Sequence, residues 1–241
     1  MSFTLALLLT GILFCTIIGL SGIAYSSNLK FFPIDSKPHG LNYSEWSSEY
    51  YKWIASIPED QNHPVKEKTG EHCTTYQNNT HMFFLVDALS GNPVSRMCDI
   101  PKDKAIFINL LYSLCDEKND REDFQSKPIQ CVEEGLADTH ISFSIDGVLF
   151  DGKSEPDINK FKTDPIFLNV SYSTGNYLLI DGDYLPAKTY KSIIGAYQII
   201  LEPLPVGEHI IAFDVLSGGC TENDPSCSPY HVNVKYNLRV I

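Results

Sequence analysis

A period of two in hydrophobicity most constrains what this chain can fold into. Residues 231–240 alternate polar and apolar side chains without a fault, and the apolar ones are Val232, Val234, Tyr236, Leu238 and Val240. In an extended strand, alternate side chains share one face, whereas in a helix these five would spread around the axis. The segment is therefore predicted to be a strand with one buried and one solvated face.

Several other segments have the same character, with Gly, Pro, Asn and Asp between them. They are residues 82–87, 105–111, 141–145 before an Asp146-Gly147 turn, 165–171, 196–201 and 208–216. Many short alternating strands predict a mainly β protein, here an antiparallel β-sandwich of the Ig-like or jelly-roll type. No linker or repeat divides residues 25–241, so we expect a single domain, with a long surface loop over residues 151–164.

One segment has helical periodicity. Over residues 44–57, Trp46, Tyr50, Trp53 and Ile57 recur at helical spacing, with Ser44 as the predicted N-cap and Pro58 as the stop. We expect its aromatic face to pack on the sandwich core, the alternative being an aromatic ligand platform. A second, shorter helix is expected over residues 128–137, after an acidic loop at 116–127.

The N-terminus predicts export. Residues 1–24 contain no Asp, Glu, Lys or Arg, and Gly22-Ile-Ala24 is a small-x-small cleavage signal before Tyr25. Two features support a retained anchor as the alternative, namely the absence of a basic n-region and an apolar run near the length of a bilayer span. Both alternatives, a cleaved signal peptide and an N-terminal membrane anchor, place residues 25–241 outside the cytoplasm, with membrane contact only through this segment.

Cysteine usage agrees with an oxidising compartment. Six of the seven cysteines follow the leader, an even set that suits disulfides. Many pairings are open, and spacing favours nearest neighbours. The expected bridges are Cys73–Cys98, Cys115–Cys131 and Cys220–Cys227.

Charge and motifs exclude several functions. Asp and Glu number 30 against 18 Lys and Arg, a net charge of −12, so nucleic acid is an unfavourable partner. There is no P-loop, Gly-x-Gly-x-x-Gly or Gly-x-Ser-x-Gly elbow, and the sequence indicates no cofactor and no catalytic residue.

The sequence offers two alternative metal sites. Copper would use Cys227, His231 and an upstream His209, but no Met follows to complete a blue-copper site. Calcium could bind the carboxylates of Asp146 and Asp151, or of Asp181 and Asp183, although Asp-Gly pairs favour tight turns.

Three Asn-x-Ser/Thr sequons provide usable glycosylation acceptors outside the cytoplasm, and we expect these residues at the surface of a glycoprotein. They begin at Asn42, Asn78 and Asn169.

The segment from residue 43 to 107 contains Tyr43-Ser-Glu-Trp46, Trp53, Asn62-His-Pro64, Cys73 and Arg96-Met-Cys98. In these residues it resembles an uncharacterised family of secreted bacterial and archaeal β-rich proteins. The resemblance implies export, a mostly β fold and the Cys73–Cys98 bridge. The family has no established activity, so it implies no functional residue.

These observations favour an exported, disulfide-stabilised β-sandwich with a structural or binding role, whose partners are other cell-surface proteins or glycans. The first alternative is an extracellular hydrolase acting on polysaccharide or an envelope polymer, which would need two close carboxylates, one with a raised pKa. The second is a metal-binding protein, with calcium ahead of copper.

Overall fold

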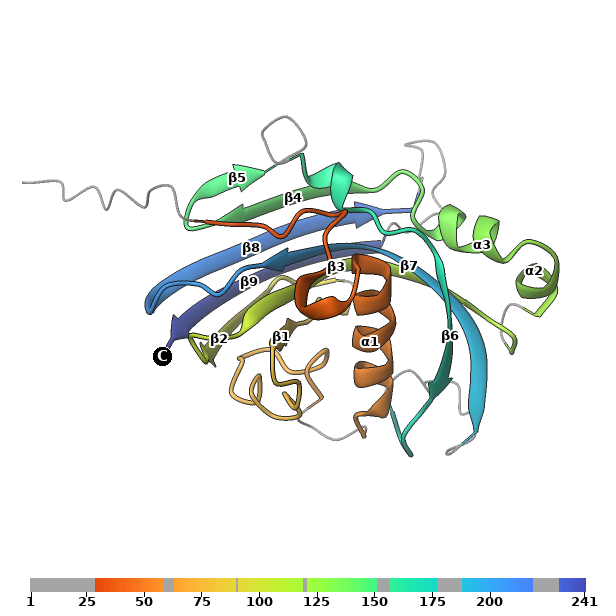
Figure 1. Cartoon of the computed structure of the whole chain (residues 1–241), viewed down its shortest axis with the longest axis horizontal. Helices are drawn as coiled ribbons and strands as arrows, with labels where there is room; N and C mark the ends of the chain where they lie inside the picture. Colours follow the sequence, from red (N-terminus) through yellow and green to blue (C-terminus); the bar gives the residue numbers. More distant parts are fainter. Residues whose placement is uncertain are drawn as a thin grey trace, which may run out of the picture.

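Two packed β-sheets and a small set of helices build the fold (Figure 1). The computed structural model describes residues 29–58, 63–89, 91–118, 121–150, 157–176, 188–218 and 230–241. The four-stranded sheet has the order β1-β3-β7-β6, and we call it the covered sheet because the α-helices pack on it. The five-stranded sheet has the order β2-β9-β8-β4-β5, and we call it the open sheet. A continuous hydrophobic core joins the two sheets, so the mainly β prediction is confirmed.

The strands follow the predicted segments, and most run further. In the covered sheet they are β1 Met82–Leu85, β3 Ala105–Asp116, β6 Ile166–Ser171 and β7 Thr189–Leu201. In the open sheet they are β2 Val94–Ile100, β4 His140–Ile145, β5 Val148–Phe150, β8 Gly207–Ser217 and β9 Tyr230–Val240. Strands β2 and β5 were not predicted from the sequence.

The sheets are mixed, so the expectation of purely antiparallel sheets was wrong. β1 pairs with β3, and β2 with β9, in parallel, while the other pairings are antiparallel. Both parallel pairs lie at a sheet edge. In the sequence, β2 of the open sheet lies between β1 and β3 of the covered sheet. The chain therefore leaves the covered sheet after β1 and re-enters it at β3, which runs in the same direction as β1.

The N-cap of helix α1, Tyr43–Ser56, lies two residues before the predicted N-cap, Ser44. The N-cap is Asn42, whose Oδ1 accepts a hydrogen bond from the Glu45 backbone N–H at 2.9 Å, while Glu45 accepts one from the Asn42 N–H at 2.7 Å. This reciprocal capping box satisfies two N–H groups that a helix start leaves free. Ser44 lies inside the helix instead, and its hydroxyl donates to the Asp164 carbonyl at 2.8 Å.

The aromatic face of α1 packs into the core, which confirms the packing interpretation. Trp46 and Trp53 are buried, and α1 lies against β6 and β7 (Figure 1). Each indole N–H is satisfied by a carbonyl, Trp46 donating to Pro38 at 2.9 Å and Trp53 to Tyr76 at 2.8 Å. A buried tryptophan whose indole N–H donates to a carbonyl is typical of a structural role.

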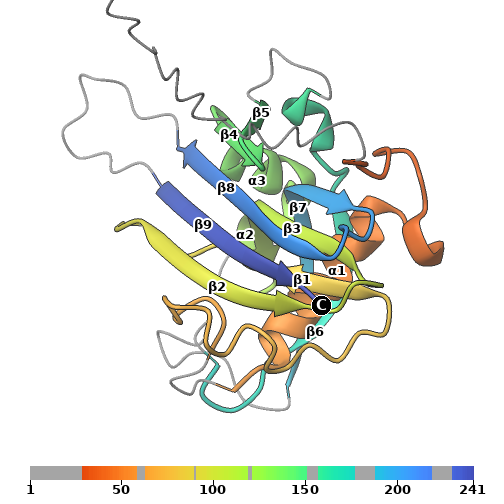
Figure 2. The same cartoon turned by 90° about the vertical axis from the view of Figure 1, so that its left-hand side faces the viewer.

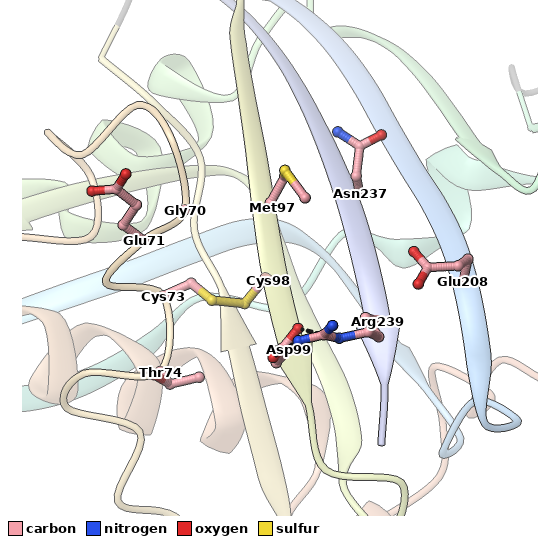
Figure 3. Close-up of a pocket in the computed structure, with 10 residues that line it drawn as sticks. All are labelled: Gly70, Glu71, Cys73, Thr74, Met97, Cys98, Asp99, Glu208, Asn237 and Arg239. Atoms are coloured by element: carbon pink, nitrogen blue, oxygen red, sulfur yellow. Dashed lines mark hydrogen bonds and ion pairs between the residues drawn. A yellow bond between two sulfur atoms is a disulfide. The ribbon is translucent and has the colours of Figure 1, made fainter.

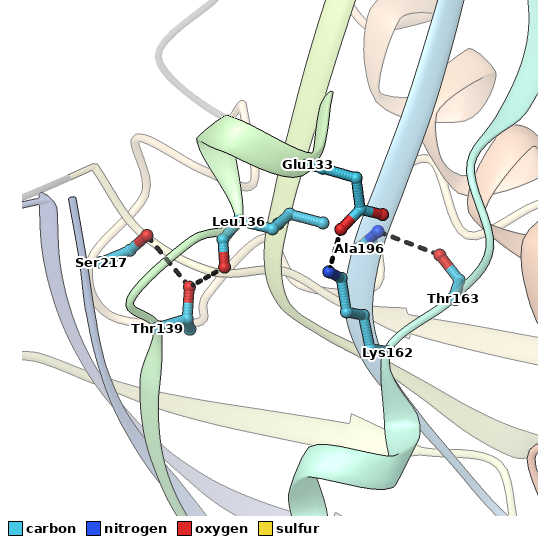
Figure 4. Close-up of polar contacts among 7 residues, drawn as sticks. All are labelled: Glu133, Leu136, Thr139, Lys162, Thr163, Ala196 and Ser217. Atoms are coloured by element: carbon cyan, nitrogen blue, oxygen red, sulfur yellow. Dashed lines mark hydrogen bonds and ion pairs between the residues drawn. The ribbon is translucent and has the colours of Figure 1, made fainter. Parts of the chain in front are cut away.

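Two short helices stand where the analysis expected a loop and one helix: α2, Arg121–Ser126, and α3, Pro128–Gly135. Figure 4 shows how α3 is tied to its surroundings. Glu133 forms an ion pair with Lys162, and the neighbouring Thr163 hydroxyl accepts a hydrogen bond from the β7 backbone at Ala196, at 2.9 Å. At the end of α3, the Thr139 hydroxyl donates to the Leu136 carbonyl at 2.8 Å and lies 3.1 Å from the Ser217 hydroxyl.

The expected surface loop at 151–164 is only partly a loop. Residues 151–156 lie outside the described residues, whereas Ile158–Phe161 form a 3-10 helix. Ile158 and Phe161 are buried in the core. The polar, proline-containing sequence around them predicted a surface loop and gave no sign that these two side chains are buried.

Two of the expected disulfides are present. Cys73 pairs with Cys98 and Cys115 with Cys131, at Cα separations of 5.9 and 6.2 Å. Cys220 and Cys227 lie outside the described residues, as does the predicted leader at 1–24. The bridges indicate that the chain folds in an oxidising compartment. Across the described ranges, no helix is long and apolar enough to cross a membrane.

Candidate functional site

The outer face of the open sheet is left uncovered by the described α-helices. Helices α1, α2 and α3 pack against β3, β6 and β7 of the covered sheet. Figure 2 shows β2, β9 and β8 side by side with their outer face uncovered. Alternation along these strands sends every second side chain to this face.

Strand register places three charged residues in one row across this face. Arg239 on β9 lies between Asp99 on β2 and Glu208 on β8. The Arg239 Nε donates to Asp99 Oδ1 at 2.9 Å, and Arg239 Nη2 also contacts Asp99 Oδ2. This two-point hydrogen bond from the guanidinium holds the pKa of Asp99 below its usual value.

A loop is held along the edge of β2, beside this row. The Met97 N–H donates to the Thr69 carbonyl at 2.8 Å, and the Cys73–Cys98 disulfide fixes the loop a few residues further on. Gly70 approaches so closely that a Cβ there would lie 2.0 Å from the Met97 carbonyl oxygen, and its φ is +86°. Only glycine fits that contact and that backbone conformation.

The Glu67 carboxylate holds the start of the same loop. It accepts hydrogen bonds from the backbone N–H groups of Thr69 at 2.5 Å and Gly70 at 2.6 Å. Partial burial raises the pKa of Glu67, but these hydrogen bonds outweigh it, so the pKa lies below its usual value. Glu67 stays ionised under ordinary conditions and keeps the turn in place.

Between the loop and the sheet lies a pocket of about 310 Å³ (Figure 3). Its walls carry the carboxylates of Glu71, Asp99 and Glu208 and the guanidinium of Arg239, a formal charge of −2 from three acids and one base. Asn237, Thr74, Met97 and the disulfide complete the lining. The volume is in the range of small-ligand sites, and the described residues of the lining carry a net negative charge and include no aromatic ring.

A second polar cluster is buried between the sheets. Arg96 points inward from β2 and donates to the carbonyls of Val65, Glu67, Val86 and Asp87 and to the Tyr236 hydroxyl. The hollow beside Arg96 and Tyr236 measures about 10 Å³, enough for about one water. We conclude that this cluster is structural, because no substrate could reach it there.

The buried carboxyl of Asp87, next to this cluster, has a raised pKa. Burial raises the pKa of its carboxyl to about 7, and the opposing effects of Arg96 and of the hydrogen bond from Asn109 only partly offset burial. The hydrolase alternative predicted a raised carboxyl in an open acidic cleft. The pKa of Asp87 is raised, but this carboxyl is buried in the core, whereas the pKa of Asp99, in the open pocket, is lowered.

The copper hypothesis was wrong about His209. Its Nδ1 lies 2.7 Å from Asp146 Oδ2 and its Nε2 2.9 Å from the Pro205 carbonyl, so both ring nitrogens are engaged. His209 is opposite Leu238 and His231 opposite Leu216, which places the two histidines at opposite ends of the β8–β9 hairpin. Cys227 lies outside the described residues.

Asp146 serves a turn, in agreement with the favoured interpretation of its Asp-Gly pair. Its φ is +50°, and its Oδ1 accepts a hydrogen bond from the Ile210 N–H at 2.8 Å. Asp151, Asp181 and Asp183 lie outside the described residues. Among the residues that are described, no group of three or more His, Cys, Asp and Glu could hold a metal ion.

The three sequons stand in different settings. Asn42 caps α1, Asn78 is exposed in a loop, and Asn169 is exposed on β6. The pocket residues Glu71, Asp99, Glu208 and Arg239 were not predicted from the sequence. The alternation of β9 could have placed Arg239 on the solvated face, but nothing local to it indicated its partners.

Comparisons with known proteins leave the family open. No family model matches the chain, and no curated protein matches it. Among solved structures, a match to the solution structure of amebosin has 13% sequence identity and a TM-score of 0.20, and covers 67% of this chain and 100% of that chain. The resemblance to secreted bacterial and archaeal proteins stays a prediction.

Proposed function

We propose that this chain is an exported binding module of the cell surface or extracellular medium, and that its ligand site is the acidic pocket on the open sheet. The observation that supports this proposal best is the pocket itself, of about 310 Å³, built between a disulfide-fixed loop and an uncovered sheet face. Both walls rest on regular structure or on a covalent bridge, so the site is pre-formed. A pre-formed site loses little conformational entropy when it binds. In this proposal the two-sheet core belongs to the Ig-like or jelly-roll class in its broad sense.

The charge of the site selects the partner. Three carboxylates and one guanidinium give the lining an excess of negative charge, within a chain of net charge −12. Such a field attracts cationic groups and repels anionic glycans and nucleic acid. Among the described residues that line the pocket, none offers an aromatic ring on which a sugar would stack. A basic segment of another extracellular protein therefore fits better than a glycan.

A hydrolase has less support. Its chemistry needs an accessible carboxyl that keeps its proton near neutral pH. Asp87, whose pKa is about 7, is buried away from the pocket.

The test is binding of a fluorescent oligolysine peptide to the full chain, with an oligoglutamate peptide and a neutral oligosaccharide as comparison probes. We expect oligolysine alone to bind, and more weakly as salt rises. Glu71→Gln should weaken binding about 2–5-fold, since one exposed carboxylate contributes about 0.5–1 kcal/mol.

The matched control is Glu122→Gln, which removes the same charge on α2, away from the pocket (Figure 1). It should leave the affinity unchanged. Equal losses in the two variants would mean that peptide binds through overall charge and would refute the site. Preferential binding of the oligosaccharide would refute the choice of a basic partner.

A further inference from the structure

An aromatic ring is left in solvent beside a sequon. Phe167 on β6 is 60% exposed, while Leu168 and Val170, on the other face of the strand, are buried. Alternation puts Phe167 on the same outer face as Asn169 and Ser171. β6 is the edge strand of the covered sheet (Figure 1), and no strand within the described ranges pairs with its free edge.

The surroundings of Phe167 form a shallow site. Phe124 of α2 packs edge-on against it, with ring centroids 6.3 Å apart and an interplanar angle of 79°. A hollow of about 360 Å³ is lined by both rings, by Asn169 and by Lys191. Lys191 lies directly opposite Asn169 in the β6–β7 register. The hollow thus combines apolar ring surface with an ammonium group beside the sequon asparagine.

We propose that Asn169 carries an N-linked glycan whose first sugar packs over Phe167. This inference rests on the proposed export, because the modification takes place in the secretory pathway of a glycosylating host. Two residues along a strand are about 7 Å, so a sugar attached to Asn169 reaches back across the ring. Its C–H groups lie against the electron-rich ring face, and its hydroxyls accept hydrogen bonds from Lys191.

The covalent step uses a lipid diphosphate-linked oligosaccharide as donor. The Asn169 Nδ2 forms a bond to the anomeric carbon of the first N-acetylhexosamine and loses one proton. The bond from that carbon to the diphosphate oxygen breaks, and the lipid diphosphate leaves with the electron pair. The Ser171 hydroxyl completes the acceptor sequon.

The other two sequons lack this platform. The residue two before Asn42 is Gly40. Tyr76 precedes Asn78 by the same interval, but it has a positive φ of 67° and packs against the core. A glycan on Asn78 would therefore stand in solvent, and this makes Asn78 the matched control.

The experiment expresses the full chain in a eukaryotic secretory host and maps the glycans by mass spectrometry. The glycans are then trimmed enzymatically to the first sugar, and thermal unfolding is measured. We expect Asn169→Gln to lower the midpoint temperature by about 2–4 °C and Asn78→Gln to change it by less than about 1 °C. Ser171→Ala removes the same glycan by a different substitution and should act like Asn169→Gln. In the Phe167→Ala background, loss of the Asn169 sugar should cost nothing further.

Each contrary outcome has a separate meaning. Sugar on Asn78 but none on Asn169 overturns this inference and leaves the export proposal intact. Sugar on Asn169 with the same stabilisation in the Phe167→Ala background overturns the packing. A full-length product without sugar at any sequon contradicts the proposed export, and the inference falls with it.

Discussion

Replacing Asp87 with Asn should remove a pH dependence of folding stability that the unaltered protein shows between about pH 4 and 7. Burial raises the pKa of this carboxyl from 3.8 to about 7 in the folded protein. Between these two values the folded chain holds a proton that the unfolded chain has released. By linkage, the folded state loses stability across this window as pH rises.

The magnitude follows from the size of the shift. A rise from 3.8 to about 7 is about 3 pH units, each worth about 1.4 kcal/mol, so the change is about 4 kcal/mol. The stability that comes from keeping Asp87 neutral is fully present below about pH 4. It is lost progressively as pH rises and is gone once pH passes about 7. Asn keeps the shape and the polar contact to Asn109 but cannot ionise, so its contribution stays constant.

The assay is urea unfolding of both proteins at a series of pH values from about 4 to 8. Carboxyls with lowered pKa values, such as Asp99 and Glu67, change stability in the opposite direction, but they are common to both proteins and cancel in the difference. Asp123→Asn, on the exposed face of α2, should show no such trend relative to the unaltered protein. A stability difference between Asp87→Asn and the parent that stays flat across the window would refute the reasoning.

Two further predictions concern the core helix and the pocket loop. Trp53→Ala should lower the free energy of unfolding by about 3–5 kcal/mol, measured in urea, because a buried indole is lost and the Tyr76 carbonyl loses its donor; an unchanged value would contradict the packing of α1. Gly70→Ala should lower the free energy of unfolding more than Gly147→Ala. Both glycines have a positive φ, +86° at Gly70 and +80° at Gly147. A Cβ at Gly147 would meet nothing within 4 Å, whereas one at Gly70 would lie 2.0 Å from the Met97 carbonyl oxygen. Equal losses would show that backbone strain alone, and not the loop contact, sets the cost.

The regular elements were predictable where one face is mostly apolar. The inward residues of β9 are all apolar, and those of β8 are apolar except His209 and Ser217, so period two identified both strands. Helix α1 was predicted because its aromatic residues recur at helical spacing. The N-cap was misplaced by two residues, since Asn42 and Ser44 are both good caps and only the Glu45 side chain decides between them.

β2 escaped prediction because its inward face carries Arg96. A charged side chain at an inward position makes an alternating strand resemble a polar loop. The burial of Arg96 becomes intelligible only with the carbonyls and the Tyr236 hydroxyl that surround it. Those partners come from distant segments, and a buried charge is tolerated only when they are all in place.

The pocket was unpredictable for a related reason. Its central ion pair joins Asp99 and Arg239, which are 140 residues apart, through a parallel pairing of β2 with β9. Parallel partners need a long connection, so no turn between them reveals their register. The disulfide that spacing did predict has an added meaning here. Cys73–Cys98 restricts the unfolded chain, and it also fixes the wall of the pocket to the strand that carries Asp99. Reduction of that bridge should therefore weaken ligand binding even under conditions in which the core, which the sheets hold together, stays folded.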